Sequence, residues 1–337
     1  MNQAPFTPTE AYDTYWRFAA ARQALYECRL TDPVGPWTDD PILQTYRFTN
    51  AYRASDRVSQ YLIREVQYDP SRPDNPTEVI FRTLLFKIFN KIETWEMIER
   101  ELGPVTWQSI DLRALDEVFD RAMARGTKIY SAAYIMPAPP FGKVRKHSNH
   151  IALLDKMMRD GLPQKIAQTE TLGEVYELIA PYPGIGNFLA FQYAIDIAYS
   201  SAVPHEEDDF VVPGPGALDG ISKCFSSTGA MTPTDIIFEM VRRQELEFDR
   251  LGLKFNGLFG RRLQPIDCQN LFCEISKYCR VAHPDIPGVA GRTKIKQTYK
   301  QLAKPMPQPF FPPKWGLSVP DYSHVPPPPP PDQGSLF

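Results

Sequence analysis

The chain shows almost no strand-like alternation of apolar and polar residues, and nearly every periodic segment has helical spacing. It contains no run of 18 or more apolar residues, so we expect no transmembrane helix and no membrane partner. Residues 1–10 lack a basic region followed by an apolar run, which argues against a signal peptide. These absences predict an all-α fold and a cytoplasmic location.

Metal and nucleotide motifs are also missing. The five cysteines form no Cys-x-x-Cys pair and the five histidines no His-x-x-x-His pair, so we expect no metal site. An odd number of cysteines suits a reducing compartment better than a disulfide framework. No Gly-x-x-x-x-Gly-Lys-Ser/Thr loop occurs, so ATP-dependent kinase activity has no support. We therefore predict no cofactor.

Charge is balanced overall but uneven along the chain. The formal net charge of −3 argues against a wholly basic protein that coats nucleic acid. Residues 251–304 nevertheless hold ten Lys or Arg against three Asp or Glu, and a short basic segment holds Lys143, Arg145 and Lys146. Each segment is either a solvated face or a surface that binds phosphate.

Periodicity and composition divide the chain into three parts. We expect an N-terminal helical region at 1–76, a helical domain at 77–304 and a Pro-rich tail at 305–337. Helices are expected at 9–30, 41–66, 77–91, 93–102, 111–125, 149–160, 171–180, 187–199, 232–250 and 265–280. The tail holds 12 prolines, which favours an extended or disordered segment. Binding of this tail by a proline-recognising partner is the alternative to a solvated extension.

The most informative segment is Pro181-Tyr182-Pro183-Gly184-Ile185-Gly186, a turn between two expected helices. Two glycines around one aliphatic residue allow a tight turn and a close approach to a ligand. The helix that starts at Asn187 offers unpaired amides, which favour an anion. We predict that Gly184, Ile185, Gly186 and Asn187 bind a DNA phosphate; an ordinary connection between two helices is the alternative.

Helix-hairpin-helix DNA glycosylases share this pattern, with a catalytic Asp about twenty residues after the turn. Asp208 and Asp209 lie 22 and 23 residues after Gly186, and the chain resembles that superfamily over about residues 77–280. Phe188 stands where the lyase-type members have a Lys nucleophile, so the chemistry of strand-cleaving lyases is not expected.

A second resemblance covers about residues 10–300. The matching motifs are Arg47–Arg53, Asp56–Leu62, Phe81-Arg82, Lys87–Asn90, Gly214–Ala217 and Asp267–Glu274. The chain resembles the alpha-glutamyl/putrescinyl thymine pyrophosphorylase family, whose helical domain is similar to one fused to 5-hydroxymethyluracil DNA kinases in phages. The resemblance implies a glycosylase-like helical fold and DNA as partner. It also implies an amine or amino-acid co-substrate, in a bacterial or phage-infected cell, or in the nucleus of a eukaryote.

In this family, an amine displaces pyrophosphate from a modified thymine, so cations are expected around the leaving group. The expected helix at 41–66 carries Arg47, Asn50, Arg53 and Arg57, interleaved with aromatic residues, and the next helix adds Arg82 and Lys87. We predict that these residues bind pyrophosphate; solvated surface charges are the alternative. We expect backbone amides of a loop at Gly214 and Gly216 to face the same anion.

The attacking amine must also lose a proton, which requires a general base. Asp196 lies in an otherwise apolar helix, and Asp208 and Asp209 are adjacent in an acidic loop. Any of the three could be the base, and Asp219 is a fourth candidate. The alternatives are a structural role for Asp196 and a solvated loop for the acidic pair.

The favoured hypothesis is therefore a DNA base hypermodification enzyme that replaces pyrophosphate on 5-hydroxymethyluracil with an amine or amino acid. The first rival is a DNA glycosylase that uses Asp209 to stabilise a sugar cation. The second is a DNA-binding module without catalytic activity, which works through its Pro-rich tail.

Overall fold

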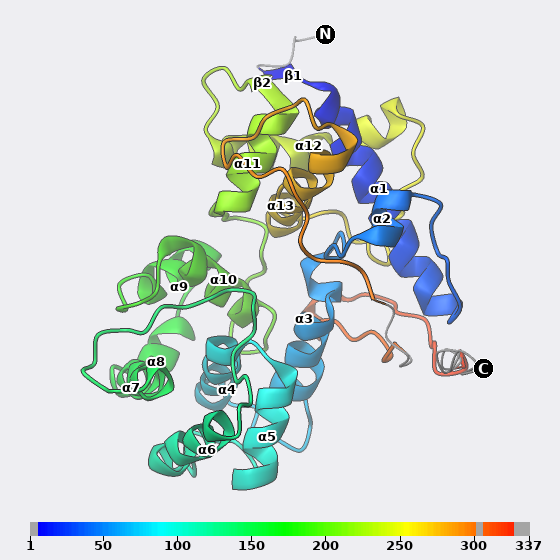
Figure 1. Ribbon diagram of the computed structural model, residues 1–337. Coiled ribbons are helices and arrows are strands. Elements are labelled where there is room, and N and C mark those ends of the chain that lie inside the picture. Colours follow the sequence, from blue (N-terminus) through cyan, green and yellow to red (C-terminus); the bar gives the residue numbers. More distant parts are fainter. Residues whose placement is uncertain (1–5, 301–305, 327–337) are drawn as a thin grey trace, which may run out of the picture. The chain divides into compact units, whose positions relative to one another are not determined.

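The chain folds almost entirely into helices, which confirms the predicted all-α class. The computed structural model describes residues 6–300 and 306–326 (Figure 1). Within them, the strands β1 (Thr7–Pro8) and β2 (Phe225–Ser227) form one short antiparallel pair. The described residues fall into two compact units, one from the ranges 6–56, 213–300, 306–309 and 317–326, the other from 57–212 and 310–316.

The first unit is built around its N-terminal helix, which begins after the predicted cap Thr9. Its helices are α1 (Glu10–Thr31), α2 (Pro41–Thr45), η1 (Arg53–Ser55), α11 (Pro215–Cys224), α12 (Pro233–Arg250) and α13 (Pro265–Ala282). Tyr15 and Trp16 of α1 are fully buried: the Tyr15 ring packs on Phe272 of α13 and the Trp16 ring on Phe248 of α12. Burial of these large rings holds the three helices together.

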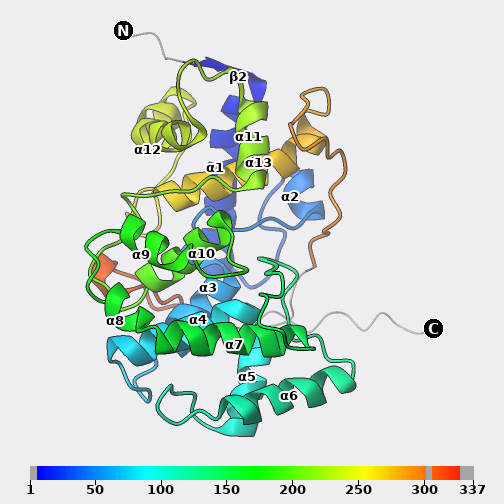
Figure 2. The same ribbon diagram turned by 90° about the vertical axis from the view of Figure 1, so that its left-hand side faces the viewer.

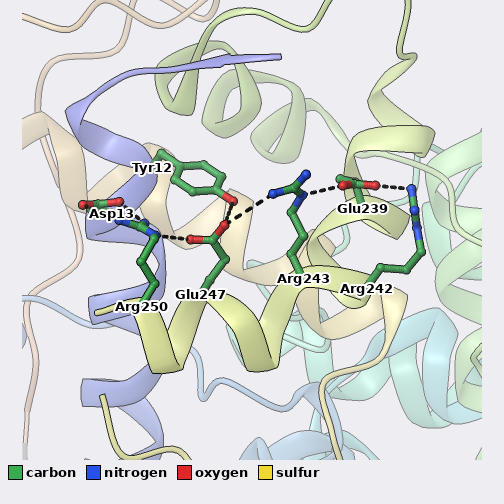
Figure 3. Close-up of polar contacts among 7 residues, drawn as sticks. All are labelled: Tyr12, Asp13, Glu239, Arg242, Arg243, Glu247 and Arg250. Atoms are coloured by element: carbon green, nitrogen blue, oxygen red, sulfur yellow. Dashed lines mark hydrogen bonds and ion pairs between the residues drawn. The ribbon is translucent and has the colours of Figure 1, made fainter. Parts of the chain in front are cut away.

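Charged side chains also join α1 to α12 (Figure 3). The Tyr12 hydroxyl donates to the Glu247 carboxylate at 2.9 Å, and Arg250 Nε lies 2.7 Å from the same carboxylate. Arg250 also pairs with Asp13 on α1, while Arg243 lies 3.8 Å from Glu247. Because Glu247 is buried, removing one of these partners would leave a poorly compensated carboxylate in the interior. Burial and the Glu247 charge raise the pKa of Tyr12, which keeps its hydroxyl protonated and donating.

Two glycines set the spacing between α11 and α13. A Cβ atom on Gly220 would lie 2.0 Å from the backbone oxygen of Phe272, and one on Gly216 would lie 3.0 Å from Cys273 Sγ. The two helices therefore pack backbone to backbone along this face. The predicted loop at Gly214–Gly216 is wrong, because Gly214 is the cap and Gly216 lies in the first turn of α11.

The predicted single helix at 41–66 is also wrong. After α2 the backbone becomes extended, because the Arg47 amide donates to the Gln297 carbonyl at 3.0 Å and the Tyr299 amide to the Thr45 carbonyl at 2.9 Å. Regular structure returns as η1, then as α3 (Arg57–Tyr61) and the π-helical segment η2 (Leu62–Gln67). Pairing with a distant segment therefore replaces local helical bonding here.

The second unit surrounds one buried helix, α4. The helices that follow η2 are α4 (Pro76–Phe89), α5 (Ile92–Leu102), α6 (Leu112–Ala124), α7 (Lys146–Arg159), α8 (Leu162–Ile166), α9 (Leu172–Ile179) and α10 (Asn187–Ala198). Every residue of α4 from Glu78 to Phe89 is buried. This helix packs against η2, α7, α8 and α10 (Figure 2). A helix that is covered on all sides is the core of its unit.

Part of the predicted Pro-rich tail packs into this unit. The backbone amide and carbonyl of Phe310 bond to the Gln60 side chain at 2.9 and 3.0 Å. Lys314, in the short helix η3 (Pro313–Trp315), donates to the carbonyls of Ser200, Val203 and His205. The Trp315 ring meets the Tyr199 ring edge-on. Residues 310–316 therefore form a strap beyond the C-terminal end of α10; residues 327–337, with most of the proline run, lie outside the described residues.

The two units are not continuous in sequence, and the boundaries expected at 76 and 304 stay a prediction. The region 1–76 contributes to both units, and the strap brings part of 305–337 into the second. Each unit is therefore assembled from segments that lie far apart in the sequence.

The close approach of α11 and α13 makes a testable prediction. Gly220→Ala should lower the free energy of unfolding by about 1–3 kcal/mol, because its methyl group meets the Phe272 backbone. Gly173→Ala in α9 is the matched control, since its methyl group would lie 3.4 Å from the Phe210 ring and improves helix propensity. Denaturation by urea measures both, and equal effects would contradict this account.

Candidate functional site

The Gly-rich turn lies between α9 and α10, as predicted. Gly184 has φ +82°, which favours glycine, and a Cβ atom there would lie 3.1 Å from Pro139. Ile185 is buried and anchors the turn. Gly186 and Asn187 are exposed, and no atom lies within 4 Å of the position of a Cβ on Gly186. The turn therefore presents the start of α10 to solvent.

A basic loop follows Pro139, the residue that Gly184 approaches. The Asn149 side chain accepts hydrogen bonds from the Phe141 and Lys143 amides and donates to the Lys143 and Arg145 carbonyls. Because the buried Asn149 holds the loop, the side chains of Lys143 and Arg145 project from a defined backbone. Both side chains are exposed, and Arg145 Nε lies 3.5 Å from Asp120 Oδ1 in an ion pair at the surface, so an anion can reach both cations.

Near the other end of α10 lies a buried ion pair. Lys87 Nζ of α4 lies 2.7 Å from Asp196 Oδ2 of α10, and both side chains are almost inaccessible to solvent. The Gln67 amide donates to the Asp196 carbonyl oxygen at 2.7 Å and to Thr83 Oγ1 at 3.0 Å. The structure thus pairs Lys87, predicted to bind pyrophosphate, with Asp196, a candidate general base. It also places Gln67 beside them, a residue that no sequence pattern indicated.

Two aromatic rings lie next to this pair. Lys87 Nζ is 4.1 Å from the centroid of the Tyr134 ring. The Tyr134 ring stacks with Phe188 of α10, with centroids 6.2 Å apart and planes inclined by 29°. The sequence carries no signal for Tyr134, because it lies in a loop without periodicity. Phe188 was noted only because it is not the lysine of a lyase.

The candidate bases differ in their exposure to solvent. Asp208 and Asp209 are both exposed, whereas Asp196 is buried. Burial and the neighbouring Asp208 charge raise the pKa of Asp209. The Leu172 amide at the start of α9 opposes that shift by hydrogen bonding. Asp209 therefore interacts with the start of α9, whose N-cap is Thr171.

The other predicted cations of this unit occupy contrasting positions. Arg57 is exposed and pairs with Glu93 at 3.5 Å. Arg82 is fully buried, and its Nε donates to the Val66 carbonyl at 2.8 Å. Burial lowers the pKa of Arg82 to about 10. In this conformation a ligand can reach Arg57 but not Arg82.

In the first unit, Asn50 lies in a polar network. Its side chain accepts from Arg22 at 2.8 Å and donates to the Ser55 carbonyl at 2.9 Å, while its amide donates to Asp56 at 2.9 Å. Burial raises the pKa of Asp56 to about 7. Asn50 therefore holds the backbone around η1.

Arg53 and Arg47 also differ in their exposure to solvent. Arg53 is buried, and its amide donates to Asp267 of α13 at 2.9 Å. Burial raises the pKa of Asp267 to about 6. Arg47 is exposed on the extended segment after α2. The expected stripe of arginines on one helical face is wrong, because no single helix carries them.

Two further sequence candidates have packing roles in the first unit. Gly216 faces Cys273, as described for α11 and α13. Asp219 is buried, accepts from the Ser276 hydroxyl and accepts from the Ala290 amide at 2.7 Å. It therefore anchors the segment after α13.

Comparison with known proteins identifies the family. A match to the family described as 5-hmdU DNA kinase, helical domain, covers residues 9–288. The chain belongs to this family. It is 27% identical to the 5-hmdU DNA kinase of Bacillus phage SP10 over an alignment of 297 positions, which covers 82% of this chain and 46% of the phage protein. The chain thus spans about half the length of that relative. No solved structure matches it.

The family confirms the predicted helical domain shared with 5-hydroxymethyluracil DNA kinases. Membership of the thymine pyrophosphorylase family and of the helix-hairpin-helix superfamily stays a prediction. Among residues 6–300 and 306–326, every helix is too short or too polar to cross a membrane. The same ranges contain no group of three or more acidic, histidine or cysteine side chains that could hold a metal ion.

The buried pair predicts a large asymmetry between single and double substitutions. Lys87→Met should lower the free energy of unfolding by about 3–5 kcal/mol, because it leaves the buried Asp196 carboxylate without its partner. Lys87→Met with Asp196→Leu should recover most of that loss. The control Lys156→Met breaks an exposed pair with Asp160 and should leave the denaturation midpoint nearly unchanged. Equal losses in the single and double variants would contradict this prediction.

The raised pKa of Asp56 predicts how stability depends on pH. The folded state binds this proton at pH values where the unfolded state has lost it, so stability should fall as pH rises from about 4 to about 7. One such carboxyl contributes at most about 1.4 kcal/mol per pH unit. Asp56→Asn should remove this part of the slope in urea denaturation across that range. Identical slopes in the wild type and in Asp56→Asn would contradict the prediction, because Asp56 would then have the same pKa in the folded and unfolded states.

Proposed function

We propose that this chain acts on 5-hydroxymethyluracil or its pyrophosphorylated derivative in DNA. The family match and the name of the phage relative support the substrate class. The observation that carries the proposal is the buried pair between Lys87 of α4 and Asp196 of α10. The other end of α10 is the exposed Gly-rich turn. One helix thus combines an anion-binding terminus with a buried pair that can respond to a charged substrate.

In this proposal, DNA binds through its phosphates. The exposed amides at Gly186 and Asn187 favour a phosphate at the start of α10, because they have no intrahelical acceptor. Lys143 and Arg145 in the neighbouring loop add positive charge without reading sequence. A base attached to this strand must leave the helix stack to reach buried groups.

The proposed reaction replaces pyrophosphate with an amine. The amine nitrogen forms a bond to the methylene carbon on C5 of the uracil ring, and the bond from that carbon to the pyrophosphate oxygen breaks. Pyrophosphate leaves with the electron pair, and Asp196 takes up the proton that the amine loses. Lys87 stabilises the negative charge that develops on the leaving group. Arg57, an exposed arginine of this unit, is proposed to bind the same pyrophosphate.

The ion pair can couple leaving-group binding to proton transfer. In the described state the Lys87 ammonium compensates the Asp196 carboxylate. A pyrophosphate group carries several negative charges and competes for that ammonium. Once Lys87 turns toward the pyrophosphate, the buried Asp196 carboxylate loses part of the positive charge that balances it. A buried carboxylate in that state takes up a proton more readily. Substrate binding therefore strengthens the base when the amine arrives.

Nucleoside mass spectrometry tests the proposal. DNA that carries pyrophosphorylated 5-hydroxymethyluracil, incubated with the protein and a mixture of amines and amino acids, should yield an amino-substituted thymidine and free pyrophosphate. Lys87→Met and Asp196→Asn should each lower the rate by about a hundredfold or more, whereas Lys156→Met should retain it. Far-UV circular dichroism and melting curves check that the variants remain folded.

The same samples distinguish the alternatives. Abasic sites without released pyrophosphate would indicate a glycosylase. Unchanged nucleosides under every condition, with DNA still bound, would indicate a binding module and would overturn the enzymatic proposal.

A further inference from the structure

The Tyr134 ring is held in place against the preference of its own backbone. Its φ angle of +54° lies in the left-handed region, which a bulky side chain rarely adopts. The ring contacts Lys87 on one side and stacks with Phe188. Strain of this kind persists only where surrounding contacts maintain it. The contacts of the ring therefore keep the backbone in this conformation.

The loop that carries Tyr134 is held near both ends and at the buried Met136, whose sulfur accepts from the Tyr193 hydroxyl. The Ser131 amide donates to the Phe89 carbonyl at 2.9 Å, and the His150 ring bonds to the Pro137 carbonyl at 3.0 Å. The residues on either side of Tyr134 are exposed, and Ile135 is 71% exposed. Because residues 132–135 make few buried contacts apart from those of the Tyr134 ring, they can move outward while Ser131 and Met136 stay in place.

We propose that the Tyr134 ring occupies a binding site for a single-ring base, which we call the ring slot: the space bounded by the Phe188 ring and Lys87 Nζ. This inference rests on the proposed function. A pyrimidine in the ring slot regains the stacking contact that Tyr134 now makes with Phe188. Its ring carbonyls also accept a charge-assisted hydrogen bond from Lys87, whereas the face of the Tyr134 ring offers only a cation–π contact.

The ring slot also explains why Tyr134 covers Lys87 in the free protein. Tyr134 shields the buried ammonium and carboxylate from water until a base replaces it. Only one six-membered ring fills the space now, so a pyrimidine fits by exchange with Tyr134, whereas a purine requires further movement. Tyr134 is thus a positioning and selectivity residue, and it relaxes from its strained backbone conformation when the base enters.

Binding of a defined duplex tests the ring slot. The probe is duplex DNA with one 5-hydroxymethyluracil next to 2-aminopurine, whose fluorescence rises when its neighbour leaves the stack. Tyr134→Ala should bind this duplex about tenfold more tightly than wild type, since no ring must be displaced. Phe188→Leu should bind it about tenfold more weakly, since the stacking surface is lost. The control Tyr134→Phe keeps the ring and should match wild type within about twofold.

The outcomes separate the inference from the proposed function. If wild type binds the duplex and raises the fluorescence but Tyr134→Ala binds no more tightly, the ring slot is wrong and the proposed function stands. If wild type neither binds nor raises the fluorescence, the proposed function fails and the inference with it.

A second measurement does not depend on DNA binding. Saturation-transfer NMR with the free nucleoside 5-hydroxymethyl-2′-deoxyuridine should detect binding to Tyr134→Ala. It should detect none to wild type or to Tyr134→Ala combined with Phe188→Leu, provided that melting curves show each variant folded. Equal signals from Tyr134→Ala and the double variant would overturn the ring slot.

Discussion

A pair of opposite charges shielded from water is the constraint on which the second unit depends. Lys87 lies on the core helix α4, where an ammonium without a partner would be strongly destabilising, and Asp196 supplies that partner from α10. The pair therefore fixes how α10 lies along α4, and Gln67 fixes the backbone at the same point. Because α10 begins at the Gly-rich turn, the position of the exposed turn follows from the position of the buried pair.

Much of the fold could be predicted from local signals. Thr9 at the start of α1 and the capping box at Thr171 mark helices that the sequence predicted within one or two residues. The turn at Gly184 was predicted from its glycines, and the positive φ angle agrees. These features depend on residues a few positions apart, which is the range over which a single sequence carries information.

The failures share a physical cause, since each involves residues far apart in the chain. The segment after α2 is extended because it pairs with residues 297–299, a contact that helical periodicity cannot reveal. Gly216 suggested a loop in the sequence, whereas in the structure it lies in a helix and its missing side chain lets α13 approach. The site followed the same rule: Lys87 and Asp196 were each noticed, but their pairing was not. Tyr134 could be found only once the structure placed it beside Lys87.

The strap has a consequence for how this helical domain can be joined to other domains. Lys314 satisfies three carbonyls just beyond the helix that bears Asp196, and Trp315 covers Tyr199. A shortened protein that ends at residue 300 keeps the whole family match, which ends at residue 288, but exposes those carbonyls and that ring. Gln308 bonds in addition to the Pro320 carbonyl and the Tyr322 amide. Fusion partners and affinity tags are therefore better attached after residue 326, so that these hydrogen bonds and those of the strap are kept.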